Sequence, residues 1–108
     1  MKLYIIGSLR NAAIPCIANA IRERFPDLVV FDDWYSAGPE ADDYWKKYEQ
    51  EKGHSYIEAL SGAAARNVFQ FDKRNIDESD GVVLVLPAGR SGHLELGYSV
   101  GCGKKTFI

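Results

Sequence analysis

Residues 81–104 read GVVLVLPAGRSGHLELGYSVGCGK, and this stretch decides the fold. The apolar, β-branched run at 82–86 has the length and composition of a strand that is covered on both faces. Pro87, Ala88 and Gly89 end the run, and Ser91 is then placed to open a helix over 91–102. This order is typical of parallel α/β sheets, whose ligands bind in the crevice outside the carboxyl ends of the strands.

The same alternation runs through the rest of the chain. We expect strands at 2–7, 28–31, 82–86 and 105–108, and helices at 14–25, 40–52, 54–61, 63–78 and 91–102. Residues 32–39 are predicted to be a polar, turn-rich loop. The pattern predicts one domain over 1–108, a flavodoxin-like or Rossmann-like three-layer α/β/α architecture with a parallel sheet.

Composition narrows the classes of function. The formal net charge of −2 gives a nucleic acid no long-range attraction. No segment has the roughly 18 apolar residues that cross a bilayer, and a short strand follows Met1, so we expect a cytoplasmic protein without membrane contact. Cys16 and Cys102 show neither CxxC nor metal-ligand spacing, so we expect buried, reduced thiols and no metal.

The predicted helix at 91–102 is rich in glycine. Each interior Gly costs roughly 0.8–1 kcal/mol of helix stability relative to Ala, so something must offset that cost. Two explanations are open: close approach of the backbone to a ligand, or tight packing of Gly97 and Gly101 against the sheet.

Two loops are predicted to lie together at the carboxyl ends of strands. Residues 7–11 read GSLRN and residues 87–91 read PAGRS, so each loop combines Gly, Ser and Arg. Their N–H groups, hydroxyls and one guanidinium would bind phosphate or sugar oxygens. Alternatively, the serines only cap helices and the arginines are solvated. The candidate binding residues are Gly7, Ser8, Arg10, Gly89, Arg90 and Ser91.

Two carboxylates are candidates for catalysis. Asp72 falls on the apolar stripe of the helix at 63–78, which also carries Ala65, Val68, Phe69 and Ile76. A buried carboxylate is costly, so Asp72 needs either a structural partner or a catalytic task. Glu95 lies in the first turns of the next helix. A capping box with Ser91 is the alternative, but that motif needs a separation of three residues and here it is four.

These motifs together resemble those of a known enzyme family. GSLRN, the Asp at position 72 ahead of SDGVVLVLP, and GRSGHLELGYSVGCGK make the chain similar to the nucleoside 2-deoxyribosyltransferase family and its relatives that hydrolyse nucleoside 5′-monophosphates. The similarity is strongest at 4–11 and 72–104, and looser over 32–62. It implies Glu95 as nucleophile, Asp72 as the acid that assists the departing base, and Ser8 and Arg10 as ligands of the 5′-phosphate.

The chain departs from the family pattern at one position. Transferases that act on free nucleosides resemble it but carry an Asp six residues before the nucleophile, where this chain has Gly89. Loss of an acid there removes repulsion against a phosphate. The departure favours a 5′-monophosphate over a free nucleoside.

The resemblance implies cleavage of the N-glycosidic bond of a 2′-deoxynucleoside or its 5′-monophosphate, without a cofactor. The carboxylate then forms a covalent ester or stabilises the charge on the sugar, and the sequence does not decide between water and a second base as acceptor. Trp34 is the candidate to stack on the base, and Asp33 the candidate to bond the base edge or sugar.

Family relatives are oligomers, so the resemblance also implies a homo-oligomer, with the aromatic face of the helix at 40–52 as candidate interface. Two other classes stay open. One is a non-catalytic nucleotide-binding module that uses the same two loops. The other is a structural or redox-partner domain of flavodoxin-like fold.

Overall fold

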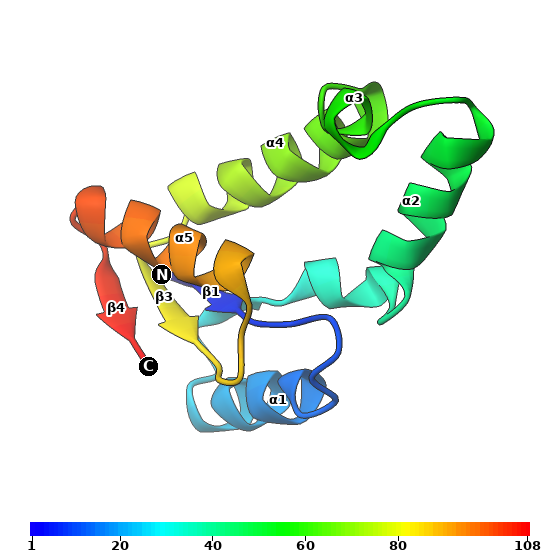
Figure 1. Cartoon of the computed structure of the whole chain (residues 1–108). Helices are drawn as coiled ribbons and strands as arrows, with labels where there is room; N and C mark the ends of the chain where they lie inside the picture. The colour runs from blue at the N-terminus through cyan, green and yellow to red at the C-terminus, as the bar shows by residue number, and fades with distance from the viewer.

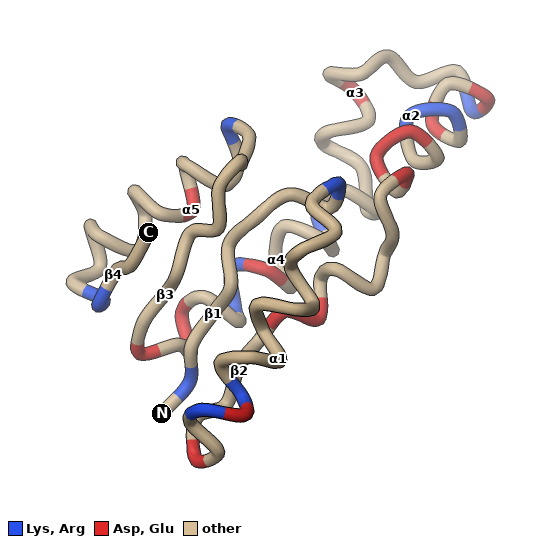
Figure 2. Tube along the Cα trace, turned by 90° about the horizontal axis from the view of Figure 1, so that it is seen from below, with Lys and Arg blue, Asp and Glu red and all other residues tan.

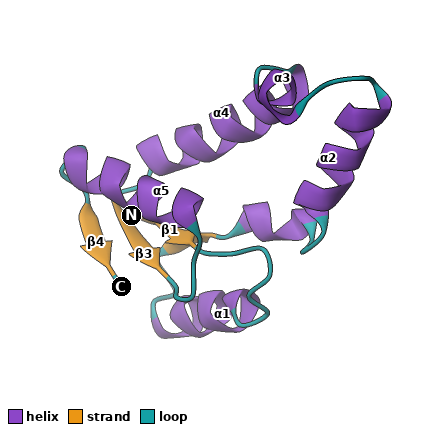
Figure 3. Ribbon diagram, in the orientation of Figure 1, coloured by secondary structure: helices purple, strands orange, loops and turns teal.

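The computed structural model describes all 108 residues, as a four-stranded sheet with five α-helices and one 3₁₀ helix (Figures 1 and 3). In chain order they are β1 (Lys2–Ile6), α1 (Ile14–Arg24), β2 (Val29–Phe31), η1 (Asp33–Ala37), α2 (Ala41–Glu51), α3 (Tyr56–Leu60), α4 (Ala63–Asp77), β3 (Gly81–Leu84), α5 (Arg90–Gly101) and β4 (Lys105–Phe107). Every expected strand and helix is present, with bounds that differ by at most two residues. Within the polar, turn-rich loop expected at 32–39, residues 33–37 wind into the 3₁₀ helix, which the sequence did not predict.

All strands are parallel, in the order β2-β1-β3-β4, which confirms the predicted fold class. β1 lies at the centre, with Leu3 opposite Val30 on one side and opposite Gly81 on the other. The chain therefore leaves β1 toward one edge of the sheet and returns through β3 toward the other. The carboxyl ends of β1 and β3 form the switch point where parallel sheets bind ligands.

Helices cover both faces of the sheet (Figure 1). α1 packs on one face, where Ile14 and Ala18 meet Ile5, Val30 and Val85. α4 and α5 pack on the other, where the buried side chains are Tyr4, Ile6, Phe31, Ile76, Val82 and Leu84, with Leu96 partly buried against them. Successive residues of β1 and β3 point to opposite faces, so both strands need apolar side chains at nearly every position.

α5 begins at Arg90, one residue earlier than expected, and Gly89 is its N-cap. A Cβ on Gly92 would lie 3.2 Å from the Cβ of Ala88 and 3.4 Å from Cγ2 of Ile6, so Gly92 lets the helix approach the sheet closely. Of the two explanations for the glycine-rich helix, packing of Gly97 and Gly101 against the sheet is wrong, because a Cβ at either position would meet no atom within 4 Å.

α2, α3 and the first half of α4 extend away from the sheet (Figure 1), and we call residues 41–70 the flap. The chain measures 47 × 28 × 21 Å as a result. The expected apolar stripe of α4 is buried at Ile76, whereas Val68 and Phe69 are exposed on the flap. Within the flap, the buried Glu49 carboxylate accepts a bond from Nδ1 of His54 at 2.6 Å.

The expectation of buried thiols is also wrong, because Cys16 and Cys102 are both free and exposed. They lie on the outer faces of α1 and at the end of α5, where no neighbouring element covers them. No helix combines the length and the apolar character that crossing a membrane requires.

Candidate functional site

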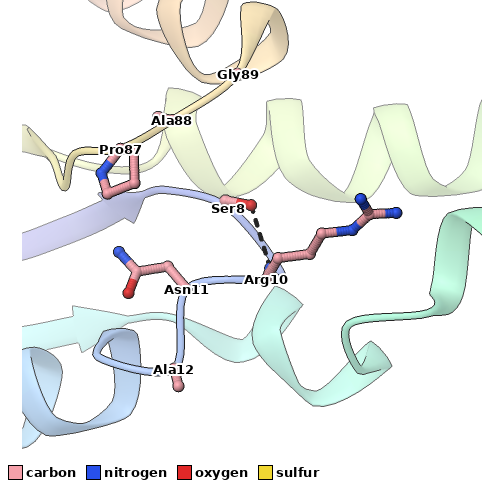
Figure 4. Close-up of a pocket in the computed structure, with 7 residues that line it drawn as sticks. All are labelled: Ser8, Arg10, Asn11, Ala12, Pro87, Ala88 and Gly89. Carbon is pink, nitrogen blue, oxygen red and sulfur yellow. Dashed lines mark hydrogen bonds between the residues drawn. The ribbon is translucent and has the colours of Figure 1, made fainter.

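A cavity of about 330 Å³ lies between the loops that follow β1 and β3 (Figure 4). Its lining residues are Ser8, Arg10, Asn11, Ala12, Pro87, Ala88 and Gly89. The two loops predicted from sequence therefore meet, at the switch point of the sheet.

The loop after β1 is a tight turn. The Ser8 hydroxyl accepts the backbone N–H of Arg10 at 3.1 Å, and the Ser8 carbonyl accepts that of Asn11 at 3.0 Å. Ser8 thus braces its own loop instead of capping α1, and its hydroxyl proton stays free to donate. A Cβ on Gly7 would lie 2.6 Å from Cδ1 of Ile14, so any larger residue here would force that buried side chain to move.

The loop after β3 contributes residues with unpaired backbone N–H groups to the cavity lining. The amides of Ala88 and Gly89 donate no hydrogen bond within the chain, and neither does that of Ala12 across the cavity. A Cβ on Gly89 would meet no atom within 4 Å, so this residue faces open space. Arg90 and Ser91 are exposed in the first turn of α5, whose unpaired N–H groups favour an anion.

Arg10 extends away from the second loop (Figure 4). Its guanidinium lies 3.5 Å from the carboxylate of Asp43 at the start of α2, and both side chains are largely exposed. The only cationic residue that lines the cavity is therefore held toward the flap.

Trp34 and Asp33 lie outside the residues that line the cavity. The indole N–H of Trp34 donates to the carbonyl of Ile5 at 2.8 Å, and the ring packs against both hydrophobic clusters. This bond anchors η1 to β1. Asp33 is exposed, and the neighbouring Asp32 pairs with Arg22 at 2.6 Å.

Asp72 and Glu95 lie on the same side of the sheet, on α4 and α5 (Figure 1). The single red segment on α5 in Figure 2 marks Glu95, the only acidic residue of that helix. Burial raises the pKa of Glu95 to about 7, and the negative charge of Asp72 adds to this. Burial alone raises the pKa of Asp72 to about 6. The Oδ1 atom of Asp72 is buried without a hydrogen-bond partner.

Tyr4 is a member of this group that sequence reasoning missed. Its side chain is buried under α4 and α5, and its pKa is raised by burial and then by the charges of Glu95 and Asp72. The phenol is therefore a neutral donor close to both acids. A tyrosine within the apolar run YII of β1 was the available signal, because a buried phenol needs a polar neighbour.

The two halves of the site are joined by α5. Gly89 of the cavity caps this helix, and Glu95 follows six residues later, a rise of about 9 Å along the axis. Neither acid lines the cavity itself. The site therefore consists of an anion-accepting end between two loops and an acidic end formed by α4 and α5, and α5 connects the two ends.

Comparisons with protein-family models, with curated proteins and with solved structures found no match to this chain.

Proposed function

We propose that the protein cleaves the N-glycosidic bond of a 2′-deoxynucleoside 5′-monophosphate or a related 2′-deoxynucleoside. The observation that carries the proposal is the pair Asp72 and Glu95, two half-buried acids with raised pKa values on neighbouring helices, beside a cavity rich in free donors. Perturbed acids of this kind are typical of catalytic sites. The reaction needs no cofactor.

The proposed chemistry divides the two acids by role. As the bond between base and C1′ breaks, positive charge develops on C1′ and the ring oxygen, and the Glu95 carboxylate bonds to C1′ as an ester. The electron pair of the broken bond leaves with the base, and the Asp72 carboxyl donates its proton there. Water or a second base then attacks C1′ and releases Glu95, which makes the protein a hydrolase or a transferase.

The pair must hold one proton for this chemistry. In the free protein both pKa values are raised, to about 6 for Asp72 and about 7 for Glu95, so the pair can share one proton near neutral pH. The proposed roles need that proton on Asp72. A bound substrate favours this arrangement, because positive charge at C1′ favours ionised Glu95 and the electron-rich base favours a proton on Asp72.

The cavity supports a phosphorylated substrate. Its lining contains a hydroxyl and several unpaired N–H groups but no carboxylate, and Gly89 leaves space where an acid would repel a phosphate. Such a substrate fits the cytoplasm, and free exposed thiols are typical of that reducing compartment.

The test is chromatography of the products formed from a panel of deoxynucleosides and deoxynucleotides, with and without a free acceptor base. We expect base release by the unaltered protein and a loss of at least about a hundredfold in Glu95→Gln. Glu23→Gln, on the exposed end of α1, is the matched control. Unchanged turnover in Glu95→Gln would remove the mechanism.

A non-catalytic nucleotide-binding module is the second candidate function. It is favoured by one observation, that the cavity between the loops is lined by neither acid. In the same experiment, tight nucleotide binding with no product after long incubation would select this candidate.

We further propose that the protein is a homo-oligomer in which a second copy covers the flap. Large apolar side chains are exposed there on all three helices: Tyr44, Tyr48, Tyr56, Ile57, Leu60, Val68 and Phe69. The aromatic face of α2 is divided, since Tyr44 and Tyr48 point outward whereas Trp45 packs edge-on against Tyr56. Apolar groupings of this kind mark interaction surfaces.

A further inference from the structure

Asn11 is a cavity-lining residue to which neither the motifs nor the proposed chemistry give a role. It is half-buried at the turn before α1, and its Oδ1 accepts the backbone N–H of Ala13 at 3.0 Å. This bond fixes the orientation of the amide group, because only the oxygen can accept. The Nδ2 group is left with two donors and has no partner in the chain.

The orientation of Asn11 places these donors in the cavity. Figure 4 shows its nitrogen on the side of Pro87 and its oxygen on the side of Ala12. The free amides of Ala12, Ala88 and Gly89 belong to residues of the same lining. An acceptor with several oxygens is the chemistry that satisfies converging donors from two loops.

Arg10, in contrast, is not held toward the cavity. Its side chain is 70% exposed and its contact is with Asp43 on α2. Turning it inward would break that contact and order a long, flexible side chain, which costs conformational entropy. The Asn11 amide is already fixed, so it binds without this cost.

We propose that Asn11 is the side chain that selects a phosphomonoester in this cavity, and that Arg10 contributes little to binding. The inference rests on the proposed function for the identity of the whole substrate, but the phosphate group alone suffices to test it. Two N–H donors at a fixed site, with the N-terminus of α5 opposite, bind the phosphate oxygens.

The experiment is calorimetric titration with inorganic phosphate of the unaltered protein, Asn11→Asp and Arg10→Gln. Asn11→Asp keeps the oxygen that accepts from Ala13 N–H and replaces the free NH₂ by a carboxylate oxygen. We expect phosphate affinity to fall at least about tenfold in Asn11→Asp and to change less than about threefold in Arg10→Gln. Equal melting temperatures of the three proteins would show that the fold is kept.

Three results would overturn the proposal: no phosphate binding by the unaltered protein, unchanged binding in Asn11→Asp, or a larger loss in Arg10→Gln than in Asn11→Asp. Base release from unphosphorylated deoxynucleosides, measured in parallel, distinguishes failure of the proposed role of Asn11 from failure of the proposed function. Glu95-dependent base release without phosphate binding would contradict the role of Asn11 but not the proposed chemistry. Asn11-dependent phosphate binding without base release from any substrate would contradict the proposed chemistry but not the role of Asn11.

Discussion

Asp72 and Glu95 are acids whose charge is controlled by burial rather than by hydrogen bonds. Asp72 has one oxygen without any partner, and burial is the first cause of the raised pKa of each residue. Removing water from a carboxyl disfavours its charged form. A protein retains such a group when the group has a task, because an apolar residue at the same place would stabilise the fold more.

We predict that base release passes through a maximum between about pH 6 and about pH 7. The active pair holds one proton, so activity falls below the pKa of Asp72, about 6, where both acids are protonated. It falls again above the pKa of Glu95, about 7, where both are ionised. Initial rates at substrate concentrations far below KM, which report the ionisation of the free protein, give the profile over a proposed range from about pH 4.5 to about pH 9. A rate that stays level up to the alkaline limit would contradict a shared proton.

We predict that Asp72→Asn stabilises the fold at alkaline pH and not at acid pH. The folded-state pKa of Asp72, about 6, lies above the value of 3.8 that an exposed aspartate has. Folding therefore costs nothing extra below the lower value, the cost grows as pH rises from the lower value to the higher one, and it is constant above the higher one. We expect a gain on the order of 2 kcal/mol above pH ~7 and almost none near pH ~3.5.

Thermal or urea unfolding of both proteins at the two pH values measures this difference. Asp27→Asn is the control, because Asp27 is exposed and forms no ion pair. An equal gain at both pH values would mean that the charge of Asp72 is not responsible.

For single residues, the sequence predicted the two acids, Asp72 and Glu95, better than it predicted the hydrogen-bond donors of the cavity. The helical period alone placed Asp72 toward the sheet, and the position of Glu95 in α5 followed from the strand before it. The direction of Arg10 was not predictable, because it depends on Asp43, which lies 33 residues away in the chain. The roles of Asn11 and Tyr4 likewise depend on which neighbours the fold brings to them.

Among the elements, α5 contributes most to the site, since its N-terminus faces the cavity and its second turn carries Glu95. The buried run at 82–86 and the loop after it predicted where this helix lies, because apolar length and turn residues are local signals. Such local sequence signals do not show which glycine of α5 faces the sheet. Gly92 does so, at the end of α5 that packs on Ile6 and Leu84, whereas Gly97 and Gly101 face open space.

We predict opposite effects of alanine at two glycines of α5. In Gly92→Ala the new Cβ would press on Ala88 at 3.2 Å, so the helix must shift and stability falls by about 1–3 kcal/mol. In Gly97→Ala the Cβ enters open space and removes a helix-breaking residue, so stability rises by up to about 1 kcal/mol. Urea unfolding of both variants checks this. A loss of stability in Gly97→Ala would mean that something covers this face of α5.

The whole molecule consists of a packed α/β body and a flap that the body does not cover. Within the flap, the helices are held by the Glu49–His54 pair, by the capping box of Ser55 and Glu58, and by the contact of Trp45 with Tyr56. The Glu49–His54 pair ties α2 to the turn before α3, the Trp45–Tyr56 contact joins the two helices, and the capping box fixes the start of α3. These contacts leave the outer apolar side chains of the flap in water, which costs free energy unless a partner covers them.

We predict that the protein in solution has at least twice the mass of the 12.0 kDa chain. Ile57 on α3 is 77% exposed and lies among the apolar side chains of the flap. A charge at position 57 would be buried without a partner in the assembly. Ile57→Lys should therefore dissociate the oligomer into single chains. Light scattering coupled to gel filtration measures the mass.

Phe25→Lys is the matched control, because Phe25 is equally an exposed apolar residue but follows α1, on the other side of the sheet from the flap helix α4. We expect it to keep the mass of the unaltered protein. Because the first half of α4 belongs to the flap and its second half carries Asp72, dissociation in Ile57→Lys should also lower base release. A single-chain protein with full activity would show that the flap needs no partner.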